Sequence, residues 1–259
     1  MIYCSYNGTD LSTLTNVLLD KIEPDQTATR NITSFRLARA DNRVITNAQY
    51  DGKDIVVTGQ IIATDKATMR SNRNSLLAAV SSGINKTLLL NLNDTIQKFT
   101  ATAEAPIFSD VNGGFARFSI KFVCRDAYGV DQNLQFLLNV TGQTTSPNTQ
   151  SLSTIGGNYD IEPIIELYIS AVSGGASKYV QFTNVATGKA IRVTSTWAVG
   201  QLLVIDPEAR TVKINNVATD SLGEFLSFAV GAGQQIKYED NFTTSRTVQI
   251  RVKYRKRYL

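Results

Sequence analysis

Alternation of apolar and polar residues between Tyr179 and Asn216 constrains the fold more than any other feature of this sequence. Side chains on a β-strand point alternately to its two faces, so apolar residues at a spacing of two predict strands with one buried face. The alternating apolar positions are Val180, Phe182, Ile191, Val193, Leu203, Ile205, Val212 and Ile214. Turn-forming residues separate them: Asn184, Gly188, Gly200, Pro207 and Asn215. The segment therefore predicts a small antiparallel β-sandwich without catalytic groups.

The composition excludes several kinds of chemistry. The 259 residues contain no His, which removes Ser-His-Asp and Cys-His catalytic arrangements and His-ligated zinc sites. The two cysteines, Cys4 and Cys124, are too few for a tetrathiolate metal site. We expect both to be buried strand residues, because free Cys packs as a small apolar group. A disulfide between them requires the first strand to pair beside the strand that ends at Cys124. We predict no metal and no cofactor.

The first residues lack both the basic region and the apolar region of a signal peptide, and no run approaches the roughly 18 apolar residues of a membrane-spanning helix. We therefore expect synthesis in a reducing cytosol.

A shift in composition indicates two domains. Residues 139–160 are polar and rich in turn-forming residues, which predicts a linker with an adjoining loop. The expected domains are an N-terminal β-rich α+β domain over 1–138, with one helix, and a C-terminal β-sandwich over 161–259, whose last strand covers about 246–256.

The N-terminal domain contains one strong helix signal, over about 65–82. Thr64 or Asp65 can cap it, and Gly83 follows as a stop signal. Its predicted apolar face comprises Met69, Leu76, Leu77 and Val80, and its other side carries Lys66, Arg70, Asn72 and Arg73. That polar side is either solvated or a subunit contact, so Arg70 and Arg73 are candidate interface residues.

Predicted strands precede and follow this helix. Ile55 to Ala63 predicts a strand in which Gly59 marks a bulge or a close backbone approach. Further on, residues 87–92 and 96–106 predict strands that lead to a hairpin loop at 110–114. The next strand alternates, with Phe118, Ile120, Phe122 and Cys124 expected in the core.

The polar segment 37–54, between apolar strands, is a candidate contact region that contains Asp41 and Arg43. It is either an arm that extends onto a neighbouring subunit or a surface hairpin.

Positive charge is concentrated at the C-terminus. Six of the 26 Lys and Arg residues follow Asp240, and no Asp or Glu residue follows it. The whole chain has a net charge of +4, so without these six cations the rest of the chain has a net charge of −2. Apolar residues alternate with these cations, which predicts a strand with one core face. We expect the outward charges to protect an edge strand or to meet an acidic neighbour, in preference to nucleic acid. Arg255, Lys256 and Arg257 are thus candidate interface residues.

The ordered motifs "DIVVTGQIIATD", "FARFSIKFVCRDAYG", "FTNVATGKAIRV", "GQLLVID" and "VQIRVKYRKRYL" resemble the distal tail (Dit) proteins of long-tailed bacteriophages. The resemblance covers most of the chain. It implies a hexameric ring at the virion tail tip, with N-terminal domains around a channel and galectin-like sandwiches outside. The implied partners are other copies of the chain, the tail tube protein, and tail-associated fibre, spike or baseplate proteins. DNA would only pass through, so we expect a neutral or acidic channel with the basic C-terminal strand directed away from it.

Two alternatives have different candidate residues. A carbohydrate-binding sandwich for host attachment would use Trp197, the one tryptophan, as a sugar platform, although a core position is also typical of Trp. An enzyme would need a carboxylate pair, for which Asp160, Glu162 and Glu166 are available. Glu162 and Glu166 lie about 13 Å apart along a predicted strand, which favours solvated strand charges over catalysis. We therefore predict a non-enzymatic protein.

Overall fold

The computed structural model describes residues 2–25, 30–36, 43–81, 83–92, 94–109, 114–174, 176–243 and 245–259, with the backbone alone for the described part of 24–50. The chain divides into two compact units, residues 1–132 and residues 133–258. Both are built mainly of antiparallel strands, and the described residues contain one α-helix. No helix among them has the length and apolar character needed to cross a membrane.

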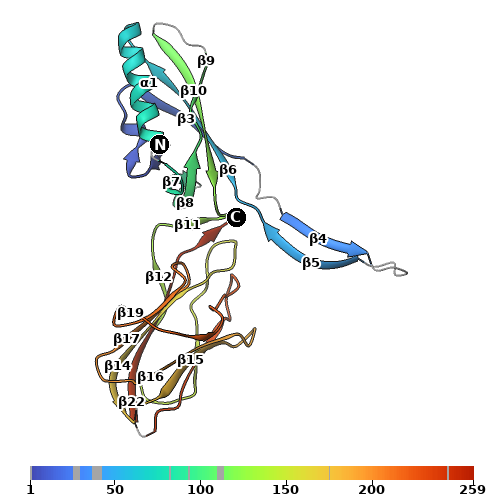
Figure 1. Ribbon diagram of the computed structural model, residues 1–259, viewed down its shortest axis with the longest axis vertical. Helices are drawn as coiled ribbons and strands as arrows, with labels where there is room; N and C mark the ends of the chain where they lie inside the picture. Colours follow the sequence, from blue (N-terminus) through green and yellow to red (C-terminus); the bar gives the residue numbers. More distant parts are fainter. Residues whose placement is uncertain are drawn as a thin grey trace. The chain divides into compact units, whose positions relative to one another are not determined.

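The first unit contains an antiparallel sheet with the order β2-β1-β7-β8-β10-β6-β3, in which β9 pairs with β10 and β11 pairs with β8 (Figure 1). Its strands are β1 (Cys4–Tyr6), β2 (Thr9–Asp10), β3 (Val17–Asp25), β6 (Asp54–Ile62), β7 (Lys86–Leu92), β8 (Thr95–Ala103), β9 (Ile107–Ser109), β10 (Phe115–Cys124) and β11 (Gly129–Asp131). A short 3-10 helix covers Leu11–Thr13. The predicted core residues of β10 are all buried. The loop predicted at 110–114 lies mostly outside the described residues.

Gly59 allows close contact at the middle of β6. A Cβ atom there would lie 2.3 Å from the Leu18 carbonyl oxygen and 2.5 Å from the Phe118 ring, so no larger residue fits without movement. The bulge lies in the partner strand β3, where the register with β6 shifts between Leu19 and Lys21. The predicted close approach is therefore in β6 and the extra residue is in β3.

Helix α1 (Lys66–Val80) begins at the predicted cap. The Asp65 carboxylate accepts a hydrogen bond from the Thr68 N–H at 2.8 Å, which satisfies a backbone donor of the first turn. Met69, Leu76 and Val80 are buried, whereas Leu77 is only half-buried. The prediction that Asn72 lies on the polar side of the helix, opposite the core, is wrong. Its buried side-chain amide donates to the Ile62 carbonyl oxygen at 3.3 Å, which lets a polar residue face the sheet.

A two-stranded hairpin, β4 (Arg30–Arg36) and β5 (Arg43–Tyr50), follows β3 in the chain. β3 and β6 pair up to Asp25 opposite Asp54, so the hairpin is inserted at that end of the β3–β6 pair. Among the described strands, β4 and β5 pair only with each other. The predicted polar segment 37–54 supplies β5 and the start of β6.

The second unit is a β-sandwich, with β14, β17 and β22 in one layer and β15 and β16 in the other (Figure 1). The six-stranded sheet has the order β12 (Gln135–Gln143), β22 (Ser245–Tyr254), β14 (Ile164–Ser173), β17 (Leu202–Asp206), β18 (Thr211–Ile214) and β19 (Val217–Ala218). The five-stranded sheet has the order β13 (Asn148–Ser151), β21 (Gln235–Asp240), β15 (Lys178–Asn184), β16 (Ala190–Ser195) and β20 (Leu222–Gly223). A short strand, β23 (Arg257–Tyr258), ends the unit.

Alternation between Tyr179 and Asn216 predicted the core of this sandwich. Of the alternating residues, all are buried except Ile214, which packs against the cluster partly exposed. Asn215 and Asn216 both have positive φ, of 49° and 66°, as a two-residue hairpin turn requires, and they join β18 to β19. Each unit has a separate hydrophobic cluster, since one cluster draws only on residues 4–124 and the other only on 137–254.

The structure corrects the expected linker over 139–160. These residues belong to the second unit, in which β12 pairs with β22 and β13 pairs with β21. The pairing of β12 contains register shifts between Phe136 and Leu138 and between Val140 and Gln143. These irregularities interrupt the two-residue period, so the polar strand does not show the alternation that predicts a strand.

The C-terminal strand β22 is not an edge strand. It lies between β12 and β14, so both of its backbone edges are hydrogen-bonded. Val248, Ile250, Val252 and Tyr254 are buried, which confirms the predicted core face. The outward cations must therefore have a role other than protecting an edge.

Candidate assembly surfaces

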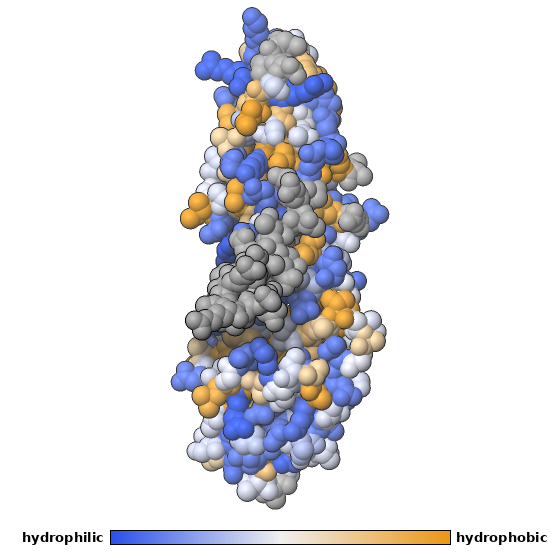
Figure 2. Space-filling view, turned by 90° about the vertical axis from the view of Figure 1, so that its right-hand side faces the viewer, coloured by the Kyte–Doolittle hydropathy of each residue, from blue (hydrophilic) through white to orange (hydrophobic). Residues whose placement is uncertain are grey.

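The described residues carry no metal-binding cluster of His, Cys, Asp and Glu. Cys4 and Cys124 are free and buried, and burial raises the pKa of each thiol to about 12. Such thiols stay protonated near neutral pH and are poor nucleophiles and metal ligands. On the face shown in Figure 2, apolar side chains lie in small groups among polar ones.

The outward cations of β22 meet an acidic residue of the neighbouring strand β14. The Lys253 ammonium lies 2.6 Å from one Glu166 carboxylate oxygen, and Arg251 lies 3.8 Å from the other. The register explains the contact, because Glu166 is directly opposite Arg251. Cross-strand pairs of opposite charge stabilise a sheet. The acidic neighbour expected from the sequence is thus in the same domain.

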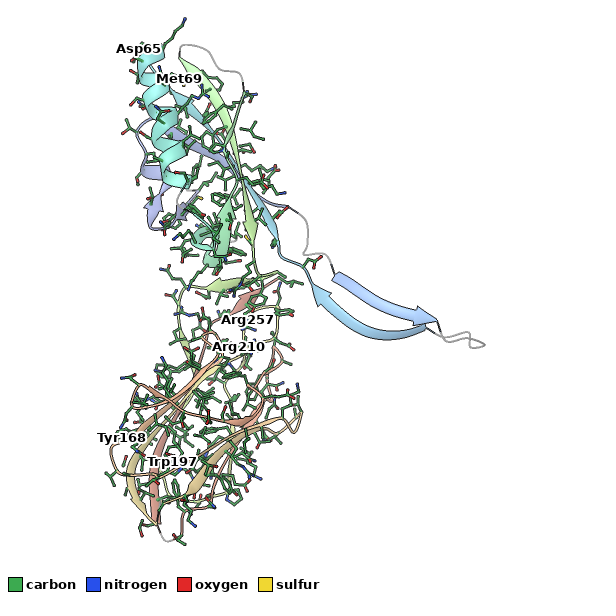
Figure 3. The ribbon with its side chains drawn as sticks, in the orientation of Figure 1. Asp65, Met69, Tyr168, Trp197, Arg210 and Arg257 are labelled. Carbon is green, nitrogen blue, oxygen red and sulfur yellow. The ribbon has the colours of Figure 1, made fainter. Side chains whose placement is uncertain are left out.

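The residues after β22 are also paired within the second unit. The Arg257 guanidinium lies 3.0 Å from Glu162, and Arg210 lies 3.5 Å from the same carboxylate; Figure 3 labels both arginines. Arg255 lies 3.9 Å from Glu208. The positive charges of Arg255 and Arg257 are therefore partly compensated within the second unit, before any partner protein binds. Lys256 is half-buried beside Gly156.

Asp240 and Arg246 form a more deeply buried pair. The Arg246 Nε lies 2.9 Å from the Asp240 carboxylate, which also accepts hydrogen bonds from the Tyr238 hydroxyl at 2.6 Å and from the Phe242 N–H at 2.9 Å. Burial and the bond to Asp240 raise the pKa of Tyr238 above its usual range. This pair fixes the turn between β21 and β22.

The two helix candidates differ in exposure. Arg70 is exposed on α1 and can contact another molecule. Arg73 is half-buried, and its guanidinium lies 4.3 Å from the centre of the Phe108 ring. The cation–π contact ties α1 to β9. Of the hairpin candidates, Arg43 begins β5, and Asp41 lies outside the described residues.

Trp197 cannot serve as the exposed sugar platform considered above. It is buried in the sandwich core, its Nε1–H donates to the Lys178 carbonyl oxygen at 2.9 Å, and its ring packs edge-on against Phe242. Burial of a large aromatic side chain with its N–H satisfied is a structural role. Figure 3 labels its position.

Sequence reasoning missed the outward apolar residues of the six-stranded sheet. Phe136, Tyr168 and Leu202 are exposed there. Tyr168 and Leu202 alternate with buried residues in clear strand patterns. Their outward positions could therefore have been predicted from the sequence.

Two family models match the chain. Residues 6–124 match a phage tail protein RIFT-related domain, and residues 156–258 match the C-terminal domain of a siphovirus-type tail component. Together they cover most of the chain, one in each unit. A comparison with curated proteins gives no match.

Two solved structures are similar. The chain aligns with the crystal structure of the Dit protein of phage SPP1 with 12% identity, a TM-score of 0.73 and 100% of each chain covered. At this identity the similarity concerns the fold. It also aligns with a chain of the phage p2 baseplate with 12% identity and 98% of each chain covered, but the TM-score of 0.44 is too low to support an argument. The matched domains, their order and the shared fold place this chain in the distal tail (Dit) family, the hub proteins of the tails of long-tailed bacteriophages.

Proposed function

We propose that this protein forms a homo-hexameric ring at the virion tail tip after synthesis in the host cytoplasm. The ring joins the tail tube to the tail-associated fibre, spike or baseplate proteins and lets DNA pass during ejection. This role is structural and needs no catalytic group. The first units surround the channel, and the sandwiches of the second units lie outside it.

The hairpin β4–β5 is the observation that most favours assembly. An isolated two-stranded hairpin is marginally stable in water, and these strands pair with no other described strand. A neighbouring subunit is the partner that a ring supplies. A closed ring needs two different patches per subunit, because its contacts are heterologous. We assign one patch to the hairpin, which includes Arg43, and expect exposed Arg70 of α1 to be near the other.

The charge distribution is compatible with DNA passage. A basic channel would hold phosphate groups through several ion pairs. Here the C-terminal cations Arg251, Lys253 and Arg257 have carboxylate partners in their own domain. We therefore expect the channel to be lined by the first unit and to be neutral or acidic.

The first test is the native mass of the purified protein, measured by light scattering at several concentrations and salt strengths. A mass of about six chains, or of two stacked rings, supports the proposal. A protein that stays monomeric, even when mixed with the tail tube protein and the spike protein of the same phage, contradicts it.

A further inference from the structure

The outer face of the six-stranded sheet departs from the usual pattern of a sandwich. Antiparallel sheets with one buried face normally carry polar residues on the other. Here Phe136 of β12 is 56% exposed, Tyr168 of β14 is 41% exposed and Leu202 of β17 is 36% exposed. All three lie on outward positions, because their neighbours Leu137, Leu167 and Leu203 are in the core. Contiguous exposed apolar residues mark interaction surfaces, and this face carries three exposed apolar residues among charged ones.

Strand register places these residues in rows across the sheet. Tyr168 lies opposite Leu202 in one direction and opposite Gln249 in the other. Phe136 and Ile164 lie on either side of Lys253, whose ammonium is 5.5 Å from the centre of the Phe136 ring. Tyr168 and Leu202 form one row, and Phe136 and Ile164 belong to a second row. A charged row lies between them. We call the surface formed by all three rows the Phe136 face.

The charged row lies between the two apolar rows. It contains Arg251, Glu166, Val204 and Lys213, which are opposite one another in successive strands. Outward positions two residues apart along a strand are about 7 Å apart, so one partner surface can cover all the rows. Tyr, Phe and Arg are enriched in protein interfaces, and this surface presents Tyr168, Phe136 and Arg251.

Electrostatics of the Phe136 face favours an acidic partner. Arg251, Lys253 and Lys213 are its basic residues, whereas Glu166 and Asp206 are its acidic ones. Lys253 takes the close contact with Glu166, which leaves Arg251 at 3.8 Å, beyond hydrogen-bond distance, and with its side chain 42% exposed. Asp206 lies at the margin of the face and accepts a hydrogen bond from the Ala209 N–H. Arg251 therefore has capacity for another carboxylate.

We infer that the Phe136 face binds a different protein, whose complementary surface places a carboxylate over Arg251 and apolar side chains against Phe136 and Tyr168. A second copy fits less well, because a symmetric contact sets the charged row, with Arg251 and Lys213 against one Glu166, opposite the same row of the other copy. This inference adds a partner site to the second unit. It depends on the proposed function only in assigning that partner to the phage tail.

Calorimetric titration tests this inference. Each of the other structural proteins of the same phage's tail is purified and titrated into the full-length protein and into Phe136→Ser, Tyr168→Ser and Arg251→Gln. Each substitution removes an exposed group from the face. The matched control is Leu222→Ser, since Leu222 is 70% exposed on the other sheet. Thermal melts verify that every variant is folded.

We expect one tail protein to bind the wild type and the control equally well. Phe136→Ser and Tyr168→Ser should each raise the Kd at least tenfold, as is typical of aromatic hot spots. Arg251→Gln should weaken binding and reduce its salt dependence.

Three results would overturn the inference: equal binding by the Phe136 face variants, no binding by any tail protein, or self-association of the wild type that Tyr168→Ser abolishes. The last result would assign the face to a second copy. Ring formation is measured separately by light scattering, so its failure is distinguishable from failure of this site.

Discussion

The buried carboxylate of Asp240 organises its surroundings through several hydrogen bonds. It accepts from the backbone, from Tyr238 and from Arg246, so protein groups compensate its charge. The Ser146 hydroxyl also accepts a hydrogen bond from the Asp240 N–H, at 2.7 Å. One residue thereby connects the end of β21, the start of β22 and the segment before β13.

Replacing Asp240 with Ala should destabilise the protein by about 3–5 kcal/mol, because Arg246 would remain as a buried charge without its partner. The check is the free energy of unfolding of the second unit in urea. Glu239→Ala is the control, because Glu239 forms a more exposed pair with Lys237 at 2.8 Å. This substitution should lower the free energy of unfolding by less than about 1 kcal/mol. Equal losses for the two variants would contradict the assigned role of Asp240.

Asp65 should make the stability of the first unit depend on pH. Hydrogen bonds from the Thr68 backbone and side chain hold the pKa of Asp65 below its usual value of 3.8. A carboxylate with a lowered pKa stabilises the folded state above its unfolded value, and the effect is lost as pH falls through the folded pKa. Asp65→Ala should therefore lower the Tm at pH 7, and the difference should shrink below about pH 4. A difference that stays constant down to pH 2.5 would contradict this.

At the scale of elements, regular alternation was predictable and irregular strands were not. β10 and the strands between Tyr179 and Asn216 each have one solvent-facing and one buried face. Polar and apolar residues therefore alternate in their sequences. β12 has the same environment but shifts register twice, so its pattern is lost. The start of α1 was predictable because the Asp65 cap acts locally, through the backbone N–H three residues further along.

Candidate surfaces were harder to predict because their geometry depends on neighbours far away in sequence. Arg257 lies beside Glu162 only because the chain returns to that point after almost a hundred residues. Trp197 is a core residue because Phe242 and the Lys178 carbonyl group meet it there. Composition alone gives no sign of either contact.

Removal of the β4–β5 hairpin should abolish the ring and leave the subunit folded. Residues 26–50 are replaced by a short Gly-Ser linker, and Lys53 is kept because its carbonyl oxygen accepts the Cys124 N–H at 2.8 Å. We expect the mass to fall to that of one chain while the thermal melt of each unit is unchanged. A variant that keeps the mass of the wild type would show that the hairpin is not a ring contact.

At the scale of the whole molecule, the two separate cores predict two independently stable parts. No residue of one hydrophobic cluster belongs to the other. Residues 133–259, produced alone, should fold with a cooperative melt and with tertiary circular dichroism from the buried Trp197. A fragment without a cooperative transition would mean that the sandwich needs the first unit. A fragment that starts at 161 should be less stable, because it lacks β12 and β13.

The place of β22 in its sheet sets an order of events during translation. The hydrophobic cluster of the first unit has been synthesised in full by residue 124, so this unit can fold while the chain is still growing. The six-stranded sheet cannot close before Ser245–Tyr254 emerges, because β12 and β14 meet only through that strand. A ribosome that stops early would release a protein with one finished half and one half that exposes apolar strands.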